Sequence, residues 1–191
     1  MRHLRRRAAA ARATVVVVSV GLVASGCASG PDVDVPDLSV PSTIEVSSPS
    51  FADGEPLPAS ETCAAEGAFP TIEWANLPQG TESVAVIVHD LDAKGGDYVH
   101  RLTTNLEPAA GSLPSAETPS GAVEYDTSNG SPGWTPPCPP SGSGTHRYVF
   151  TVLALDRPTR IPTTAKTQTV LLTVGEAAFA QGAITGTVTA D

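Results

Sequence analysis

Residues 83–90 read Ser-Val-Ala-Val-Ile-Val-His-Asp, and this segment decides the fold class. Successive side chains of a strand point to opposite faces, yet apolar residues fill both faces here until His89. This pattern is typical of a central strand that is covered on both sides. Residues 146–156 show the same pattern. The sequence therefore predicts a sheet whose central strands are buried.

Weaker segments complete an all-β prediction with one or two short helices. Gly and Pro together supply about one residue in five (17 Gly and 18 Pro in 191), which disfavours a helical bundle or a coiled coil. The helix candidate is 168–181, where apolar residues recur at helical spacing. Further strands are expected at 98–105, 44–46, 71–74 and 183–188.

The N-terminus has the organisation of an export signal. Arginines precede an apolar run over 14–24, and small residues then lead to Cys27. We expect residues 1–26 to be a lipoprotein signal peptide and Cys27 to be the acylated residue; an ordinary signal peptide with a chance cysteine is the alternative. Residues 27–43, rich in Pro, Asp and Ser, are expected to be a flexible tether, and 44–191 the domain. The predicted location is the outer face of the cytoplasmic membrane.

Removal of the signal peptide makes the chain strongly acidic. From Cys27 onward, six basic side chains face twenty acidic ones, a net charge of −14 with neutral histidines. Nucleic-acid binding needs clustered Lys and Arg, which this segment lacks. Nucleic acid is therefore excluded as a partner.

Export also bears on the two remaining cysteines. Cys63 and Cys138 are expected to form a disulfide, because thiols in an oxidising compartment usually pair. A reactive thiol or a pair of metal ligands is the alternative. The separation of 75 residues and the absence of a Cys-x-x-Cys motif disfavour it.

The side chains that could carry chemistry lie near strand ends. Asp90 and Asp92 follow the first buried strand, and Asp90 is predicted to share a face with Val84, Val86 and Val88, opposite His89. Taken one by one, these residues also fit structural roles: an acidic turn, a core histidine and a buried strand start. The other candidates are His100 within its strand and His146 and Tyr148 at the start of the last one.

Taken together, the motifs resemble the phosphatidylethanolamine-binding protein family, in its bacterial Raf-kinase-inhibitor-like branch. The most specific match is Pro-Cys-Pro-Pro at 137–140 followed by Gly-Thr-His-Arg-Tyr at 144–148. The other matching stretches, in order, are 48–54, 73–83, 90–93 and 98–100 with Asn105.

This resemblance implies a β-sandwich-like fold with a pocket for anions and phosphate-bearing head groups. It supports pairing of Cys63 with Cys138, and it implies no cofactor and no metal. Histidine and tyrosine can donate hydrogen bonds to phosphoryl oxygens, so binding is expected to strengthen at mildly acid pH. The implied ligand-binding residues are Asp90, Asp92, His100, Pro139, His146 and Tyr148.

Three residues depart from the family pattern beside this pocket. Leu91 and Lys94 replace the two prolines of the acidic motif, and Arg101 replaces a tryptophan. Lys94 would add positive charge near the pocket, and Arg101 would change its wall or its rim.

The predicted function is non-enzymatic binding of a small anion or phosphorylated ligand by a lipid-anchored protein. The first alternative is a module that inhibits an extracytoplasmic protease or kinase, which an exposed apolar patch around Trp134 would favour. A hydrolase using His146 or His100 is disfavoured, because Ser141 and Ser143 lack a Gly-x-Ser-x-Gly setting. A zinc site is disfavoured because no closely spaced ligand pair is present.

Overall fold

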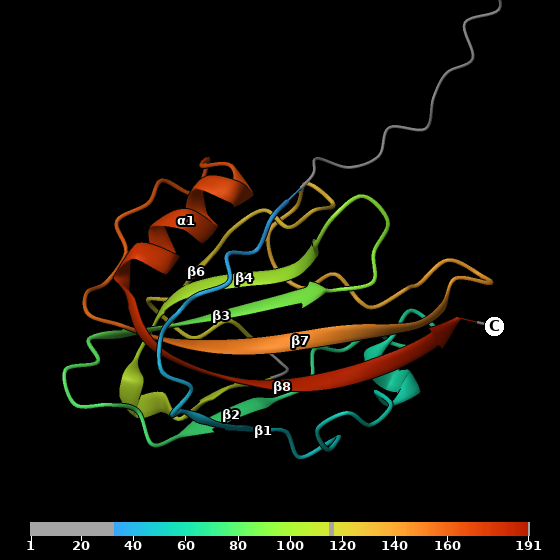
Figure 1. The fold of residues 1–191 in the computed structure, drawn as a ribbon, viewed down its shortest axis with the longest axis horizontal. Coiled ribbons are helices and arrows are strands. Elements are labelled where there is room, and N and C mark those ends of the chain that lie inside the picture. Colours follow the sequence, from blue (N-terminus) through green and yellow to red (C-terminus); the bar gives the residue numbers. More distant parts are fainter. Residues whose placement is uncertain (1–32, 115–116, 191) are drawn as a thin grey trace, which may run out of the picture.

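Two antiparallel sheets form the domain, and the larger one contains the segment that decides the fold. The computed structural model describes residues 33–114 and 117–190. The five-stranded sheet has the order β6-β4-β3-β7-β8 and the three-stranded sheet the order β1-β2-β5 (Figure 1). The strands of the larger sheet are β3 (Ser83–Asp90), β4 (Tyr98–Leu106), β6 (Val123–Glu124), β7 (Gly144–Leu155) and β8 (Ala178–Ala190).

The smaller sheet lies on one face of the larger one. Its strands are β1 (Glu45–Ser47), β2 (Ile72–Ala75) and β5 (Ser112–Leu113), and two 3-10 turns span Ala59–Glu61 and Pro108–Ala110. Trp74 and Leu113 of this sheet share one apolar cluster with Val86 and Phe150 of the larger sheet. The prediction of an all-β, sandwich-like fold is confirmed.

The opposite face of the larger sheet is covered by α1 (Thr167–Ala177). Val170 and Val174 of this helix pack against Ile87 and Leu153 in a second apolar cluster. All eight residues of β3 are buried because the strand is covered on both faces and paired on both edges. This is the arrangement that the apolar pattern of 83–90 predicts.

The predicted helix at 168–181 is too long by four residues. The helix ends at Ala177, and residues 178–181 already belong to β8, which pairs with β7 along its whole length. Pairing with the long β7 strand prevails over the helical spacing of these residues. The short strands β5 and β6 were not predicted.

Part of the predicted flexible tether packs against the domain. Within residues 33–43, which we call the N-terminal segment, Val33 is buried and bridges Asp97, and Ser42 bridges Gln181. Val35 and Leu38 pack against the helix-side cluster. Residues 33–43 therefore do not extend freely from the domain as predicted: Val33 is buried, and Val35 and Leu38 are half-buried against it. Residues 27–32, Cys27 among them, and the predicted signal peptide lie outside the described residues.

Candidate functional site

A pocket of about 410 Å³ opens where β3, β4 and β7 carry their polar side chains. This volume lies within the usual range of small-molecule sites, roughly 300–1,000 Å³. We call it the Asp90 pocket. Its lining contains all six of the predicted ligand-binding residues: Asp90, Asp92, His100, Pro139, His146 and Tyr148.

Asp90 is the buried anchor of this pocket. Strands β3 and β7 pair so that Asp90 lies opposite Tyr148, which brings the carboxylate close to His146. His146 Nδ1 lies 2.6 Å from Asp90 Oδ2, and the Asp92 backbone N–H donates to Asp90 Oδ1 at 2.8 Å. Burial, together with the nearby Asp90 carboxylate, raises the pKa of Tyr148, so its hydroxyl stays protonated.

His100 is held by the proline-rich loop before β7. Its Nδ1 lies 2.7 Å from the carbonyl oxygen of Thr135, and the Thr135 N–H donates to the His100 carbonyl at 2.9 Å. Because a carbonyl only accepts, Nδ1 carries a proton. Burial lowers the pKa of His100, and the bond to Thr135 opposes this only in part. At neutral pH the ring is therefore uncharged, and its Nε2 is an acceptor.

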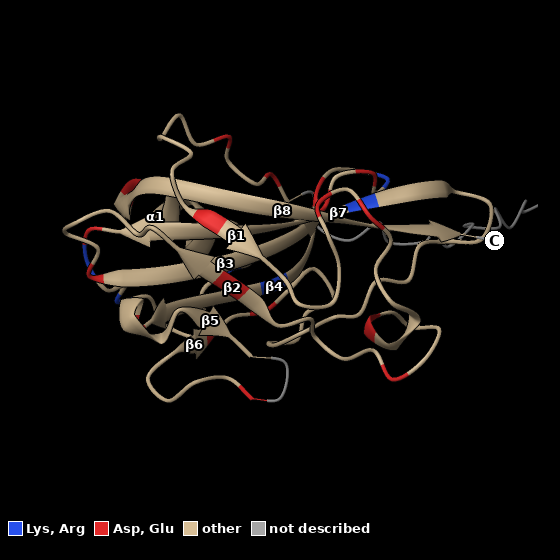
Figure 2. Cartoon of the chain, turned by 90° about the horizontal axis from the view of Figure 1, so that it is seen from below, with Lys and Arg blue, Asp and Glu red and all other residues tan. Residues whose placement is uncertain are grey.

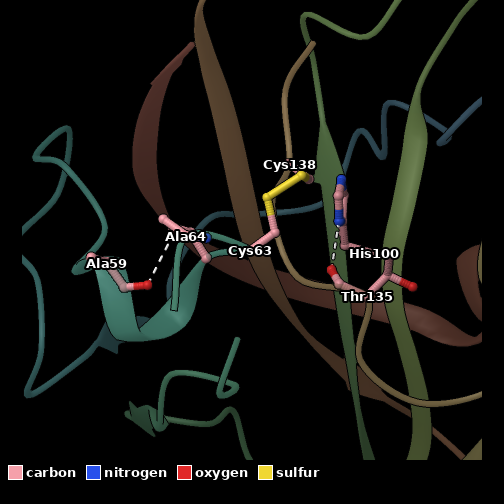
Figure 3. Close-up of a disulfide and its surroundings, with 7 residues drawn as sticks. Ala59, Cys63, Ala64, His100, Thr135 and Cys138 are labelled. Carbon is pink, nitrogen blue, oxygen red and sulfur yellow. Dashed lines mark hydrogen bonds between the residues drawn. A yellow bond between two sulfur atoms is a disulfide. The ribbon is translucent and has the colours of Figure 1, made fainter. Parts of the chain in front are cut away.

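A disulfide fixes the same loop. Cys63 and Cys138 are joined, with their Cα atoms 5.4 Å apart, next to His100 and Thr135 (Figure 3). The Cys63 N–H also donates to the Pro137 carbonyl at 3.0 Å. The predicted pairing is confirmed. Since Cys138 lines the Asp90 pocket, the bond ties one wall of the pocket to the turn around Cys63.

The rim carries an ion pair that the sequence did not predict. Arg147 Nε and Nη2 donate to the two carboxylate oxygens of Asp92, each at 2.9 Å, and the Arg147 backbone N–H adds a third bond. Hydrogen bonds from the Arg147 side chain lower the pKa of Asp92 to about 2. Asp92 therefore stays ionised at physiological pH and is already partnered before any ligand arrives.

The three departures from the family pattern occupy different places. Lys94 lines the Asp90 pocket. Arg101 does not; it is buried, bonded to Glu124 and placed 4.1 Å over the Phe69 ring. Leu91 is exposed and borders a cavity on the opposite face of the sheet.

Four residues of this region were not among the predicted ligand-binding residues. Tyr98 and Thr135 line the pocket, Arg147 binds Asp92, and Ser143 Oγ lies 2.9 Å from His146 Nε2. Arg147 lies next to His146 in the motif at 144–148, which is the signal that could have found it. No local motif marks Ser143, because its partners come together only in the folded sheet.

Two observations limit the chemistry of the described residues. Within 33–114 and 117–190, no three His, Cys, Asp or Glu side chains form a group that could hold a metal ion. In the same ranges, no helix has the length and apolar character that a membrane span requires. Trp134 is half-buried and packs edge-on against Phe69, with ring centres 5.1 Å apart.

Comparison with known proteins identifies the family. The sequence profile described as phosphatidylethanolamine-binding protein matches residues 47–189. The chain therefore belongs to the phosphatidylethanolamine-binding protein family, as the motifs predicted.

Individual relatives agree with this assignment. The chain is 36% identical over 144 residues to "Putative lipoprotein LppC" of Mycobacterium tuberculosis, covering 75% of this chain and 71% of that protein. It is 37% identical over 153 residues to a UPF0098 protein of Mycobacterium bovis, covering 80% and 74% of the two chains.

Two solved structures share the fold. CT736 of Chlamydia trachomatis, described as a putative phosphatidylethanolamine-binding protein homolog, has a TM-score of 0.72 at 27% identity, covering 78% of this chain and 99% of its own. YbcL of E. coli, described as a member of the mammalian family, has a TM-score of 0.72 at 28% identity, covering 76% and 98%.

Proposed function

We propose that this protein is an exported lipoprotein whose Asp90 pocket binds a small anion or a phosphorylated ligand, such as a phospholipid head group. The observation that carries the proposal is the meeting of His100 and His146 at one pocket, each with Nδ1 bound to a protein acceptor. Nδ1 is thus held by the protein in both rings. A ligand in the pocket would meet the Nε2 side of His100, and at His146 it would replace the exposed Ser143 hydroxyl, which lies 2.9 Å from Nε2. The proposed activity is binding.

Protonation decides what this pocket can bind. With both histidines neutral, their Nε2 atoms are acceptors and repel the oxygens of an anion. When they are protonated, each Nε2 becomes a charged donor, and Lys94 adds a further positive charge. Anion binding should therefore be coupled to proton uptake and should strengthen as the pH falls.

The proposed setting is the outer face of the cytoplasmic membrane, with the anchor on Cys27. The apolar run followed by a cysteine and the similarity to LppC, whose name includes the word lipoprotein, support it. The N-terminal segment begins only six residues after Cys27, so an anchored domain would stay close to lipid head groups. Acidic positions outnumber basic ones over the described domain (Figure 2), which favours a compact pocket over a broad anion-binding surface.

Calorimetric titration of the full chain in detergent with phosphate and with phosphoethanolamine, at pH 5.5 and 7.5, tests this proposal. We expect saturable binding that is tighter at pH 5.5, and a loss of at least about tenfold in the His100→Ala/His146→Ala double variant. His89→Leu, on the opposite face of the sheet, is the matched control and should bind as the wild type does. Absence of binding by a folded wild type, or equal binding by the double variant, would contradict the proposal.

A protein partner remains the alternative from the sequence. An inhibitor of an extracytoplasmic protease or kinase needs an apolar contact surface, and Trp134, where such a surface was expected, is half-buried. The pocket is therefore the better-supported site.

A further inference from the structure

Ser143, His146 and Asp90 form a chain of hydrogen bonds at the Asp90 pocket. Ser143 Oγ lies 2.9 Å from His146 Nε2, and His146 Nδ1 lies 2.6 Å from Asp90 Oδ2. The serine is exposed at the pocket, whereas the other two residues are buried. A nucleophile bonded to a base that a third group orients is the diagnostic geometry of nucleophilic catalysis.

The hydrogen-bond partners define the proton positions. The Asp90 carboxylate accepts, so His146 Nδ1 carries the proton, and the neutral ring presents a lone pair at Nε2. Ser143 Oγ–H must then donate to Nε2, which is the direction that general-base activation requires. Asp90 is itself held by the Asp92 N–H, and its orientation of the imidazole is therefore fixed.

We infer that Ser143 is an activated nucleophile that takes the acyl group of small carboxylic esters. Ser143 Oγ attacks the ester carbonyl carbon while its proton moves to His146 Nε2. The carbon–oxygen bond to the alcohol then breaks, and the alcohol leaves with that proton. Water, deprotonated by His146, releases the acid and restores Ser143, so the net reaction is ester plus water to acid plus alcohol. A cavity of about 410 Å³ admits short acyl groups.

The surroundings of Ser143 offer little stabilisation to an oxyanion. The Ser143 N–H already donates to the Pro140 carbonyl at 3.0 Å, so the amide of the nucleophile is not free to bind an oxyanion. Removing one such donor costs a factor of about 10² to 10³ in other enzymes. Lys94 lines the same pocket and carries the positive charge that a developing oxyanion needs. Activated esters are therefore the substrates expected to react. Their good leaving group speeds acylation but is gone before the acid is released, so the acylated protein should accumulate.

This reaction goes beyond the proposed binding function and uses the opposite protonation state. Anion binding needs protonated histidines, whereas acylation needs neutral His146, so reactivity should rise with pH where phosphate affinity falls. Phosphate should also protect Ser143 at pH 5.5 more than at pH 7.5. The titratable groups that face His146 across the pocket are Asp90, Asp92, Lys94, Tyr98, His100 and Tyr148.

Labelling of the full chain in detergent with a fluorophosphonate probe at pH 7.5 tests the inference. Attack of Ser143 Oγ on phosphorus expels fluoride, and mass spectrometry of the peptides identifies the modified residue. A burst of nitrophenol from p-nitrophenyl acetate measures acylation independently. We expect a single adduct on Ser143 and a burst of about one equivalent.

The Ser143→Ala variant should lose the label and at least about 90% of the burst, since its hydroxyl is the nucleophile. Ser141→Ala, a serine of the same loop that does not line the pocket, should keep both. Phosphate binding by the wild-type chain at pH 5.5, measured on the same preparation, separates a failure of this inference from a failure of the binding proposal. No adduct on the wild type, or an unchanged burst in Ser143→Ala, would overturn the inference.

Discussion

His89 and Asp90 are consecutive residues of β3, but their side chains line cavities on opposite faces of the larger sheet. Asp90 lines the pocket of about 410 Å³ with His100 and His146. His89 borders a cavity of about 270 Å³, which we call the His89 cavity, under the N-terminal segment. The alternation that the sequence predicts for 83–90 thus divides this strand end into two chemically different sites.

The buried histidines of the two cavities differ in their hydrogen-bond partners. In the Asp90 pocket, His100 and His146 each have an acceptor at Nδ1. His89 Nδ1 is buried and has no hydrogen-bond partner, and apolar side chains such as Ile87 and Leu153 dominate its surroundings. Polar groups that hold one another in a fixed arrangement are available for a ligand, whereas an unpartnered buried group only costs stability. This contrast supports the Asp90 pocket as the proposed binding site.

Removing the disulfide should cause the largest loss of stability of the changes considered. The loss should affect the loop that forms one wall of the Asp90 pocket. Cys138 lines the Asp90 pocket, and the bond closes a loop of 75 residues. A Cys63→Ser/Cys138→Ser variant should lose about 4 kcal/mol of unfolding free energy in the chain-entropy model. Urea denaturation measures this loss. A cost below about 1 kcal/mol would show that the loop is held without the covalent bond.

Asp90→Asn should be the next most costly change. The carboxylate accepts from His146 and from the Asp92 N–H, and hydrogen bonds to a charged group contribute about 1.5–3 kcal/mol each to stability. We expect a loss of about 2 kcal/mol in urea denaturation. Wild-type stability would mean that the network around Asp90 carries no net energy.

Val33→Ala tests how much the N-terminal segment, which covers the His89 cavity, contributes to stability. Val33 is buried against the sheet and bridges Asp97, next to a Gly96 whose φ of +115° and close approach to the Val33 carbonyl favour glycine. We expect a loss of about 1.5 kcal/mol, because a buried side chain is shortened, with unchanged phosphate affinity. Unchanged stability, measured by thermal denaturation, would show that the N-terminal segment does not contribute to the fold.

His89→Leu should produce a smaller effect of opposite sign. The change removes a buried nitrogen without a partner and should stabilise the domain by about 1 kcal/mol at pH 6. Burial lowers the pKa of His89, with Asp97 and Asp90 opposing it, so the unfolded chain binds the proton more readily. The stability of the wild type should then fall as the pH drops below about 6.5, and it should fall less steeply in His89→Leu. Urea denaturation at several pH values measures this. If the free energy of unfolding falls equally steeply with pH in the wild type and in His89→Leu, the account is contradicted.

The sequence predicted the elements whose signal is local. The eight residues of β3 were placed correctly because burial on both faces leaves an unbroken apolar run. The six pocket residues were found through motifs that span the chain, although their use by a ligand stays a prediction. The acylation of Cys27 and the absence of enzymatic turnover also stay predictions.

What the sequence did not reveal depends on tertiary contacts. The start of β8 at Ala178 was read as helix because only its pairing with β7 makes it a strand. Val33 and Val35 alternate with Asp32 and Asp34, but the acidic composition suggested a tether. Ser143 was set aside for lack of a motif, because its triad partner Asp90 lies 53 residues away and reaches it through His146.

Proton uptake on anion binding is the most direct test of the central claim. Calorimetric titration of the full chain with phosphate at pH 6.5, in two buffers of different ionisation enthalpy, measures the protons taken up. We predict net uptake, because the histidines of the Asp90 pocket must be charged to hold the anion, and we predict that the His100→Ala/His146→Ala variant loses it. Phosphate binding with no proton uptake would contradict the claim that these histidines are the switch.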